Sequence, residues 1–85
     1  MKPLPQKTMI KQHIKTLFDM LQPTDQLRTD DVYRYVKRMI GKQIYPDTVI
    51  RYMREMRQDG DINYTILSKR ERRIEVLKPG EAHSL

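Results

Sequence analysis

The sequence predicts a small α+β domain, mainly helical, in which three helices precede a C-terminal β-hairpin. Two periodicities carry this prediction. Between residues 7 and 59, apolar residues recur every three or four positions in three separate runs, as on the buried face of an amphipathic helix. After Gly60 the period falls to two, as in strands with one buried face. The 85-residue length suits one domain and leaves no room for a second.

The first helix is predicted over residues 7–21. Pro23 ends it, because proline lacks the backbone N–H that a helix needs. Residues 1–6 contain two prolines and no periodicity, so we expect them to form a flexible N-terminal arm. The expected buried stripe, with Phe18 on its flank, consists of Ile10, Ile14, Leu17 and Leu21.

A short extended piece, Leu27-Arg28, leads into the second predicted helix. We expect Thr29 to cap this helix, since its hydroxyl oxygen can accept a hydrogen bond from an unpaired amide of the first turn. Gly41 predicts the end of the helix, because glycine adopts the left-handed conformation there without strain. Its buried stripe is expected to consist of Val32, Val36 and Met39.

The third helix is predicted from Pro46, whose fixed φ suits the first helical position, to Asp59, which precedes a terminating glycine. Its buried face is expected to hold Val49, Met53 and Met56. The outward face is then left to Asp47, Arg51, Arg54, Glu55 and Gln58, with Thr48 at its border.

The hairpin is predicted from two alternating runs joined by a loop over residues 68–72. Residues 79–85 have neither periodicity nor bulk, so we expect a frayed tail and a folded domain over residues 7–78. The residues expected to alternate towards the core are Ile62, Tyr64, Ile66, Ile74 and Val76.

Composition argues against several kinds of function. There is no cysteine, which excludes disulfides and thiolate zinc sites and favours a cytoplasmic setting. The longest apolar runs are two or three residues, against about 20 for a membrane span, so no membrane partner is expected. No nucleophile has a base placed to activate it, and no residues have metal-ligand spacing. We therefore expect no enzyme activity, no metal, no cofactor and no small-molecule ligand.

The charge points to a polyanionic partner. The chain has 17 Lys and Arg against 11 Asp and Glu, a formal net charge of +6, and seven of the basic residues fall between Arg51 and Arg73. The alternative is that these are solubilising charges on a helix face and a loop.

A run of residue types in the third predicted helix carries a family resemblance. It comprises a Thr-Val pair, a basic residue, an apolar-Arg-Glu-apolar core and a closing glycine, represented here by Thr48, Val49, Arg51, Met53-Arg54-Glu55-Met56 and Gly60. This run resembles the recognition helix of prokaryotic winged-helix transcription regulators, and the order of elements extends the resemblance over residues 7–78. The resemblance implies a winged helix-turn-helix domain that binds double-stranded DNA. Helix 46–59 would enter the major groove, and the basic wing over residues 68–73 would lie against the minor groove or the backbone.

Three acidic residues depart from the family pattern. Asp61 stands where relatives often carry an apolar residue, and Asp47 and Glu55 lie on the expected DNA-facing side, where they disfavour phosphate contact. An acid can also accept a hydrogen bond from the cytosine amino group, so base recognition by Asp47 or Glu55 stays open.

Arg51 and Arg54 are the leading candidates for base contact, because a guanidinium can bond guanine O6 and N7 together. For Arg54 the alternative is an ion pair with its helix neighbours, and for Tyr45 it is half-buried packing. The other candidates on this helix are Tyr45, Asp47, Thr48 and Gln58.

Four basic residues lie on or beside the hairpin loop, with one acid, Glu71, among them. Narrow minor grooves attract an inserted arginine, which favours Arg70 or Arg72 as the probe. The alternative is that a charged loop keeps an edge strand from aggregating. The four candidates are Lys69, Arg70, Arg72 and Arg73.

Two functions therefore stay open. The first is a transcription regulator of prokaryotic, plasmid, viral or phage origin. The second is a winged-helix protein-interaction module in a larger assembly, which the same fold supports. Basic faces favour the first, because protein interfaces are usually depleted of charge at their centre. A weaker stripe on helix 7–21 suggests a homodimer, with partial burial as the alternative, and consists of Met9, His13, Thr16 and Met20.

Overall fold

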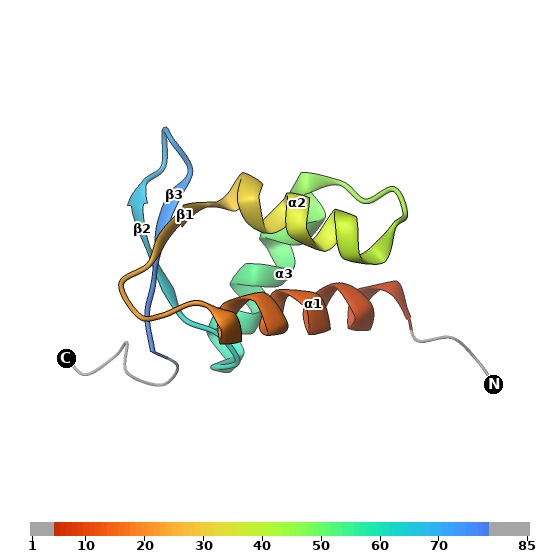
Figure 1. Cartoon of the computed structure of the whole chain (residues 1–85), viewed down its shortest axis with the longest axis horizontal. Coiled ribbons are helices and arrows are strands. Elements are labelled where there is room, and N and C mark those ends of the chain that lie inside the picture. The colour runs from red at the N-terminus through yellow and green to blue at the C-terminus, as the bar shows by residue number, and fades with distance from the viewer. Residues whose placement is uncertain (1–4, 79–85) are drawn as a thin grey trace.

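The computed structural model describes residues 5–78 and contains three helices and three strands (Figure 1). The predicted α+β class, mainly helical with a C-terminal hairpin, is confirmed. The predicted tail over 79–85 and residues 1–4 of the predicted arm lie outside the described residues. The elements are α1 (Gln6–Met20), β1 (Gln26–Arg28), α2 (Thr29–Ile40), α3 (Pro46–Asp59), β2 (Tyr64–Ser68) and β3 (Arg73–Val76).

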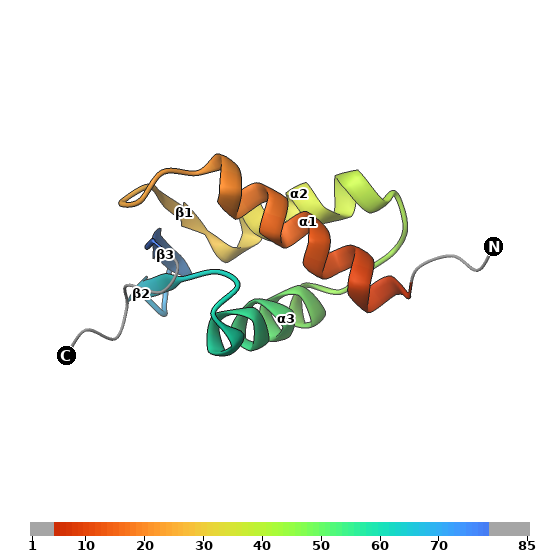
Figure 2. The same cartoon turned by 90° about the horizontal axis from the view of Figure 1, so that it is seen from below.

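The three helices pack against one another around a single core, with α1 and α2 on one side, α3 on the other and the sheet at one end (Figure 2). Val49, Met53 and Met56 bury one face of α3, as their spacing predicts. The first helix differs in detail, because Phe18 is buried while Leu17 and Leu21 are half-buried.

Among the described residues, no helix combines the length and apolar character needed to cross a bilayer.

The sheet has the strand order β1-β3-β2 and is antiparallel throughout. The predicted extended piece around Leu27 becomes a third strand, in which Leu27 pairs with Ile74 of the hairpin. This three-helix, three-stranded arrangement is compatible with a winged-helix layout. It also makes β3 the central strand, so the hairpin is attached to the segment that leads into α2.

The prediction that Thr29 caps α2 is wrong. The N-cap is Arg28, whose backbone N–H donates to Asp31 Oδ2 at 3.0 Å. Because β1 pairs with β3 as far as Arg28, the helix begins one residue earlier than expected, at Thr29. The Thr29 hydroxyl is buried and has no hydrogen-bond partner among the described residues.

Two predicted core positions are also wrong. Met39 is 50% exposed, and Ile40 packs against the core in its place, since the buried stripe of α2 continues at a spacing of four from Val36. Ile66 is 48% exposed, although Tyr64 on the same strand is buried, because Ile66 lies nearer the hairpin loop and lines a surface groove instead of the core. Asn63, expected to face outwards, is buried.

Both predicted helix ends are confirmed. Gly41 follows α2 with a φ of 72°, and Gly60 follows α3 with a φ of 86°, both in the left-handed region that glycine enters without strain. The turn between α2 and α3 is held by Tyr33, whose hydroxyl donates to the carbonyl of Ile44 at 3.0 Å. The Tyr33 bond therefore holds the turn before α3, while Gly60 ends the helix.

The corrected cap of α2 yields a test with two substitutions. Asp31→Ala is expected to lower the free energy of unfolding by about 1 kcal/mol, because it removes the acceptor for the Arg28 amide. Thr29→Val is expected to leave it unchanged or raise it, because the buried hydroxyl gains no bond in the fold. Urea unfolding at pH 7 measures both. A loss for Thr29→Val as large as that for Asp31→Ala would restore Thr29 as the cap.

Candidate nucleic-acid interface

The outward face of α3 presents most of the residues predicted for it. Asp47, Arg51, Arg54 and Gln58 are exposed, and Thr48 is half-buried. Arg54 makes no ion pair with any described residue, so the alternative predicted for it, an ion pair with its helix neighbours, is absent from the described part of the structure. The face is therefore a row of polar side chains with two arginines one turn apart.

The hairpin and α3 share one surface groove of about 310 Å³, which we call the α3–hairpin groove. It brings together three of the sequence-predicted candidates from two separate elements. Its floor is apolar and is formed by Ile50, Tyr64, Ile66 and Ile74. Its basic rim consists of Arg54 from α3 with Lys69 and Arg72 from the hairpin loop.

The hairpin loop, residues 69–72, is held by bonds of its own and by α2. Ser68 Oγ accepts from the Glu71 amide at 3.2 Å, and the Arg72 amide donates to the Lys69 carbonyl at 3.3 Å. The carbonyl of Arg72 accepts from the Thr29 amide at 2.9 Å, which ties the end of the loop to the start of α2. Arg72 has a φ of 57°, a left-handed conformation that costs a non-glycine residue free energy.

The four basic residues of the hairpin are not equivalent. Arg72 Nη1 lies 3.3 Å from Asp30 Oδ1, and Arg73 Nη2 lies 3.2 Å from Glu71 Oε1. Lys69 and Arg70 make no ion pair with any described residue. The charge that the loop leaves unpaired is thus that of Lys69 and Arg70.

Arg73 lies apart from the α3–hairpin groove. It is the first residue of β3 and alternates with the buried Ile74, so it points to the other face of the sheet. There it lines a separate hollow together with Arg28 and Asp31. The structure therefore does not bring Arg73 together with Arg54, Lys69 and Arg72.

Glu55 binds two lysines of α1, a contact that the sequence did not reveal. Lys11 Nζ donates to Glu55 Oε1 at 3.0 Å, and Lys7 Nζ lies 3.3 Å from the same oxygen. The hydrogen bond from Lys11 is the largest cause that lowers the pKa of Glu55 below its ordinary value. Glu55 is therefore held charged between α1 and α3. The i,i+4 spacing of the two lysines was visible in the sequence, but their partner on another helix was not.

Two tyrosines of this region differ sharply in exposure. Tyr45, at the start of α3, is 67% exposed, so half-buried packing does not describe it. Tyr64 is buried beneath the guanidinium of Arg57, which lies 4.9 Å from its ring centroid. Burial raises the pKa of Tyr64 in spite of Arg57 and Arg54, so its hydroxyl is protonated at neutral pH. Arg57 was not among the sequence candidates.

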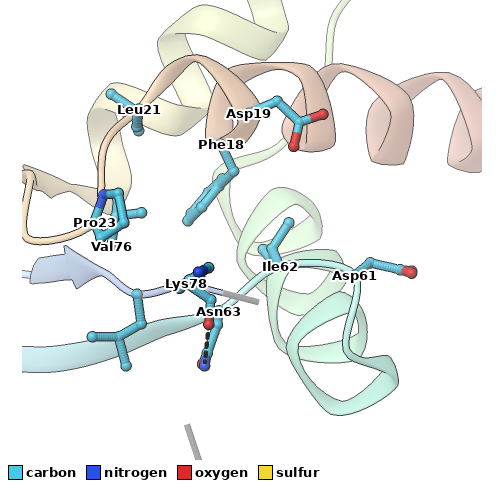
Figure 3. Close-up of a pocket in the computed structure, with 10 residues that line it drawn as sticks. Phe18, Asp19, Leu21, Pro23, Asp61, Ile62, Asn63, Val76 and Lys78 are labelled. Carbon is cyan, nitrogen blue, oxygen red and sulfur yellow. Dashed lines mark hydrogen bonds between the residues drawn. The ribbon is translucent and has the colours of Figure 1, made fainter. Parts of the chain in front are cut away.

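A separate pocket of about 340 Å³ lies between the end of α1, the segment after α3 and the end of β3 (Figure 3). Phe18 and Ile62 form apolar walls. The side-chain amide of Asn63 donates to the carbonyl of Lys78 at 3.4 Å, and its own oxygen is buried without a partner among the described residues. The volume is at the lower end of the range for ligand sites. The absence of a small-molecule ligand stays a prediction.

Comparison with known proteins assigns this chain to no family. No protein family, curated protein sequence or solved structure matches it. Any function must therefore be argued from the side chains and the electrostatics of the chain itself.

The link between Glu55 and α1 predicts a specific pH dependence. Because the folded-state pKa of Glu55 lies below its ordinary 4.5, its charge stabilises the fold above that value, and the contribution is lost as the pH falls through the folded-state pKa. Glu55→Gln is expected to lower Tm slightly at pH 7, since exposed ion pairs contribute little. The difference from the wild type should be smaller at pH 3 than at pH 7, because the stabilisation is lost as the pH falls below 4.5 and through the lowered pKa of Glu55. Thermal melts at both pH values measure this effect.

Asp19→Asn is the matched control for Glu55→Gln. Asp19 also pairs with a lysine, Lys15, but both residues lie within α1 and link no two helices. A Tm difference between wild type and Glu55→Gln that is the same at pH 7 and pH 3 would contradict the role assigned to the carboxylate charge.

Proposed function

We propose that this chain is a winged-helix protein that binds double-stranded DNA and acts as a small transcription regulator. In this proposal α3 enters the major groove, which is about 12 Å wide and admits one helix. The hairpin loop lies against the minor groove or the backbone. The observation that carries the proposal is the α3–hairpin groove, where Arg54, Lys69 and Arg72 from two elements form one basic rim.

The division of roles follows from exposure and pairing. Arg51 and Arg54 are exposed on α3 and suit bidentate contact with guanine, while Thr48 suits a thymine methyl or a phosphate. Lys69 and Arg70 suit phosphates, because neither is held by an acid of the described chain. Glu55 has no part in base recognition in this proposal, because two lysines of α1 already hold it.

One observation favours a second candidate function, a protein-interaction module. The floor of the α3–hairpin groove is apolar, and Ile66 and Leu67 of β2 are 48% and 43% exposed. Such a surface also suits an apolar segment of a protein partner. On DNA the same floor would face the deoxyribose. Binding to duplex DNA that is strong and sensitive to salt favours the first function, and no binding at low salt favours the second.

Oligomeric state and location stay predictions within this proposal. Met20 and Thr16, on the weaker stripe of α1, are exposed, while Met9 and His13 are half-buried. The exposed pair leaves surface for a homodimer through α1, whereas the half-buried pair fits the alternative of partial burial. DNA half-sites with twofold symmetry would accompany a dimer. A cytoplasmic setting is likewise proposed from the lack of cysteine.

The proposal separates base contacts from phosphate contacts. With about six phosphates contacted, the logarithm of affinity should fall against the logarithm of salt concentration with a slope near −5. Lys69→Ala should make that slope less steep by about 0.9. Arg51→Ala should instead reduce discrimination between a selected site and random DNA by about 1–3 kcal/mol. Fluorescence anisotropy titrations at several salt concentrations measure both, and equal effects of the two variants would remove the assignment.

Arg70 and Arg73 provide a matched pair within one hairpin. Arg70→Gln is expected to weaken binding to random duplex DNA about eightfold at 0.1 M salt, the effect of one lost phosphate contact. Arg73→Gln removes the same charge but is expected to change affinity less than twofold, because Arg73 pairs with Glu71 on the other face of the sheet. If Arg73→Gln weakened binding more than Arg70→Gln did, the phosphate contact would lie on the face of the sheet that carries Arg73.

A further inference from the structure

A second basic hollow, of about 550 Å³, lies at the C-terminal end of α2. We call it the α2-end hollow. Two residues of the turn that follows the helix, Gly41 and Gln43, contribute to its lining. Its four cationic side chains are Arg34, Lys37, Arg38 and Lys42.

The charge of this hollow is unbalanced. All four cations are exposed, no acid is among the residues that line it, and none of the four makes an ion pair with a described residue. This contrasts with Lys7, Lys11, Arg72 and Arg73, each of which lies beside an acid of this chain. The α2-end hollow therefore offers four positive charges to a ligand.

Helix geometry makes the cluster costly to keep without a ligand. Arg34 and Arg38 are four residues apart, and Arg34 and Lys37 are three apart, so like charges are neighbours on one face. The helix dipole favours Lys37 and Arg38 in the last turn, but it does little for Arg34, a turn further back. An anion in the hollow would relieve the repulsion among all four.

The wall of the hollow is fixed by packing. Lys37 Nζ lies 5.8 Å from the centroid of the Tyr33 ring, and the Tyr33 hydroxyl donates to the Ile44 carbonyl across the turn. The turn that carries Lys42 is thus held against α2, which keeps Lys42 beside Arg38.

The α2-end hollow is separate from the α3–hairpin groove. Both views show the turn between α2 and α3 at the opposite end of the molecule from the sheet and hairpin (Figures 1 and 2). No described residue lines both surfaces. The hollow is thus an independent cationic surface, and α3 starts directly beyond it at Pro46.

We infer that the α2-end hollow is a second site for the phosphate backbone of DNA. Duplex DNA carries about one negative charge per 1.7 Å of axis, so one stretch of backbone can meet four clustered cations. Arg34 and Arg38 would bind phosphate oxygens through their planar guanidinium groups, with Lys37 and Lys42 as point charges. The inference rests on the proposed function in one respect only, namely that the polyanion is DNA. The phosphates belong either to a distal part of the duplex on α3 or to a second duplex.

The test uses the full chain and a fluorescent 24-base-pair duplex of random sequence. Arg38→Gln/Lys42→Gln lowers the net charge from +6 to +4 and removes two of the four cations. It is expected to weaken binding about sixtyfold at 0.1 M salt, the effect of two lost phosphate contacts, and to make the salt slope less steep by about 1.8. Its Tm should equal or exceed that of the wild type, since repulsion is removed.

Lys15→Gln/Arg28→Gln is the matched control, because it also gives a net charge of +4 but lies outside both the hollow and the groove. Its affinity is expected to stay within twofold of the wild type. Equal losses in control and test variants would overturn the inference, because net charge alone would then explain the effect.

Two further measurements are needed. The first identifies the source of the phosphates, and the second distinguishes a failure of this inference from a failure of the proposed function. A complex of one chain with two 24-base-pair duplexes in native mass spectrometry indicates a second duplex, and a complex with one indicates a shared duplex, because 24 base pairs exceed the 44 Å length of the molecule. Arg54→Gln/Lys69→Gln tests the α3–hairpin groove in the same titration. If only this variant weakens binding, the α2-end site is wrong and the proposed function stands. If only Arg38→Gln/Lys42→Gln weakens binding, the α2-end site stands and the role proposed for the α3–hairpin groove is wrong.

Discussion

The pairing of β1 with β3 is the constraint on which the candidate interface depends. A two-stranded hairpin alone is marginal in water, and here β3 gains a second partner, the strand Gln26–Arg28, which makes the sheet three-stranded. The pairing continues beyond the strand at both ends, because the Thr24 amide donates to the Val76 carbonyl and the Thr29 amide to the Arg72 carbonyl. The hairpin is thereby fixed to the start of α2, which in turn packs on α3.

This attachment explains why two distant segments make one surface. The α3–hairpin groove needs Arg54 and Lys69 to hold a constant separation, although 15 positions separate them in the chain. A hairpin joined to α3 only through residues 60–63 would swing about that connection. With β1 paired to β3, the Arg72 carbonyl is bound to the first residue of α2. The left-handed conformation of Arg72 itself belongs to the hairpin turn, which the Arg72 amide closes on the Lys69 carbonyl.

The sequence predicts those features that are determined locally. The bounds of α3 and the left-handed glycines after α2 and α3 follow from proline, glycine and apolar spacing near each position. The Thr29 cap was predicted wrongly because it depends on how far β1 pairs with β3. The burial of Ile66 was predicted wrongly because it depends on how far the core extends along the hairpin. The same distinction holds for the candidate site. The exposure of Arg51 and Arg54 follows from the period of the helix and was predicted. The position of Arg73, away from the α3–hairpin groove, depends on the alternation of side chains along β3 and was not predicted.

Pairing among the charges then decides where the excess positive charge is available. Asp30, Glu55 and Glu71 each lie beside cations of the chain. Within residues 5–78 this leaves without an ion pair Arg54, Lys69 and Arg70 around the hairpin and the four cations at the end of α2. The Arg72–Asp30 pair is itself exposed, and such pairs contribute at most about 1 kcal/mol. A phosphate can therefore displace Asp30 from Arg72 at little cost. Because solvent screens exposed charges beyond about 10 Å at 0.1 M salt, the two clusters would act independently on the proposed DNA ligand, and its affinity would depend on how many phosphates reach both.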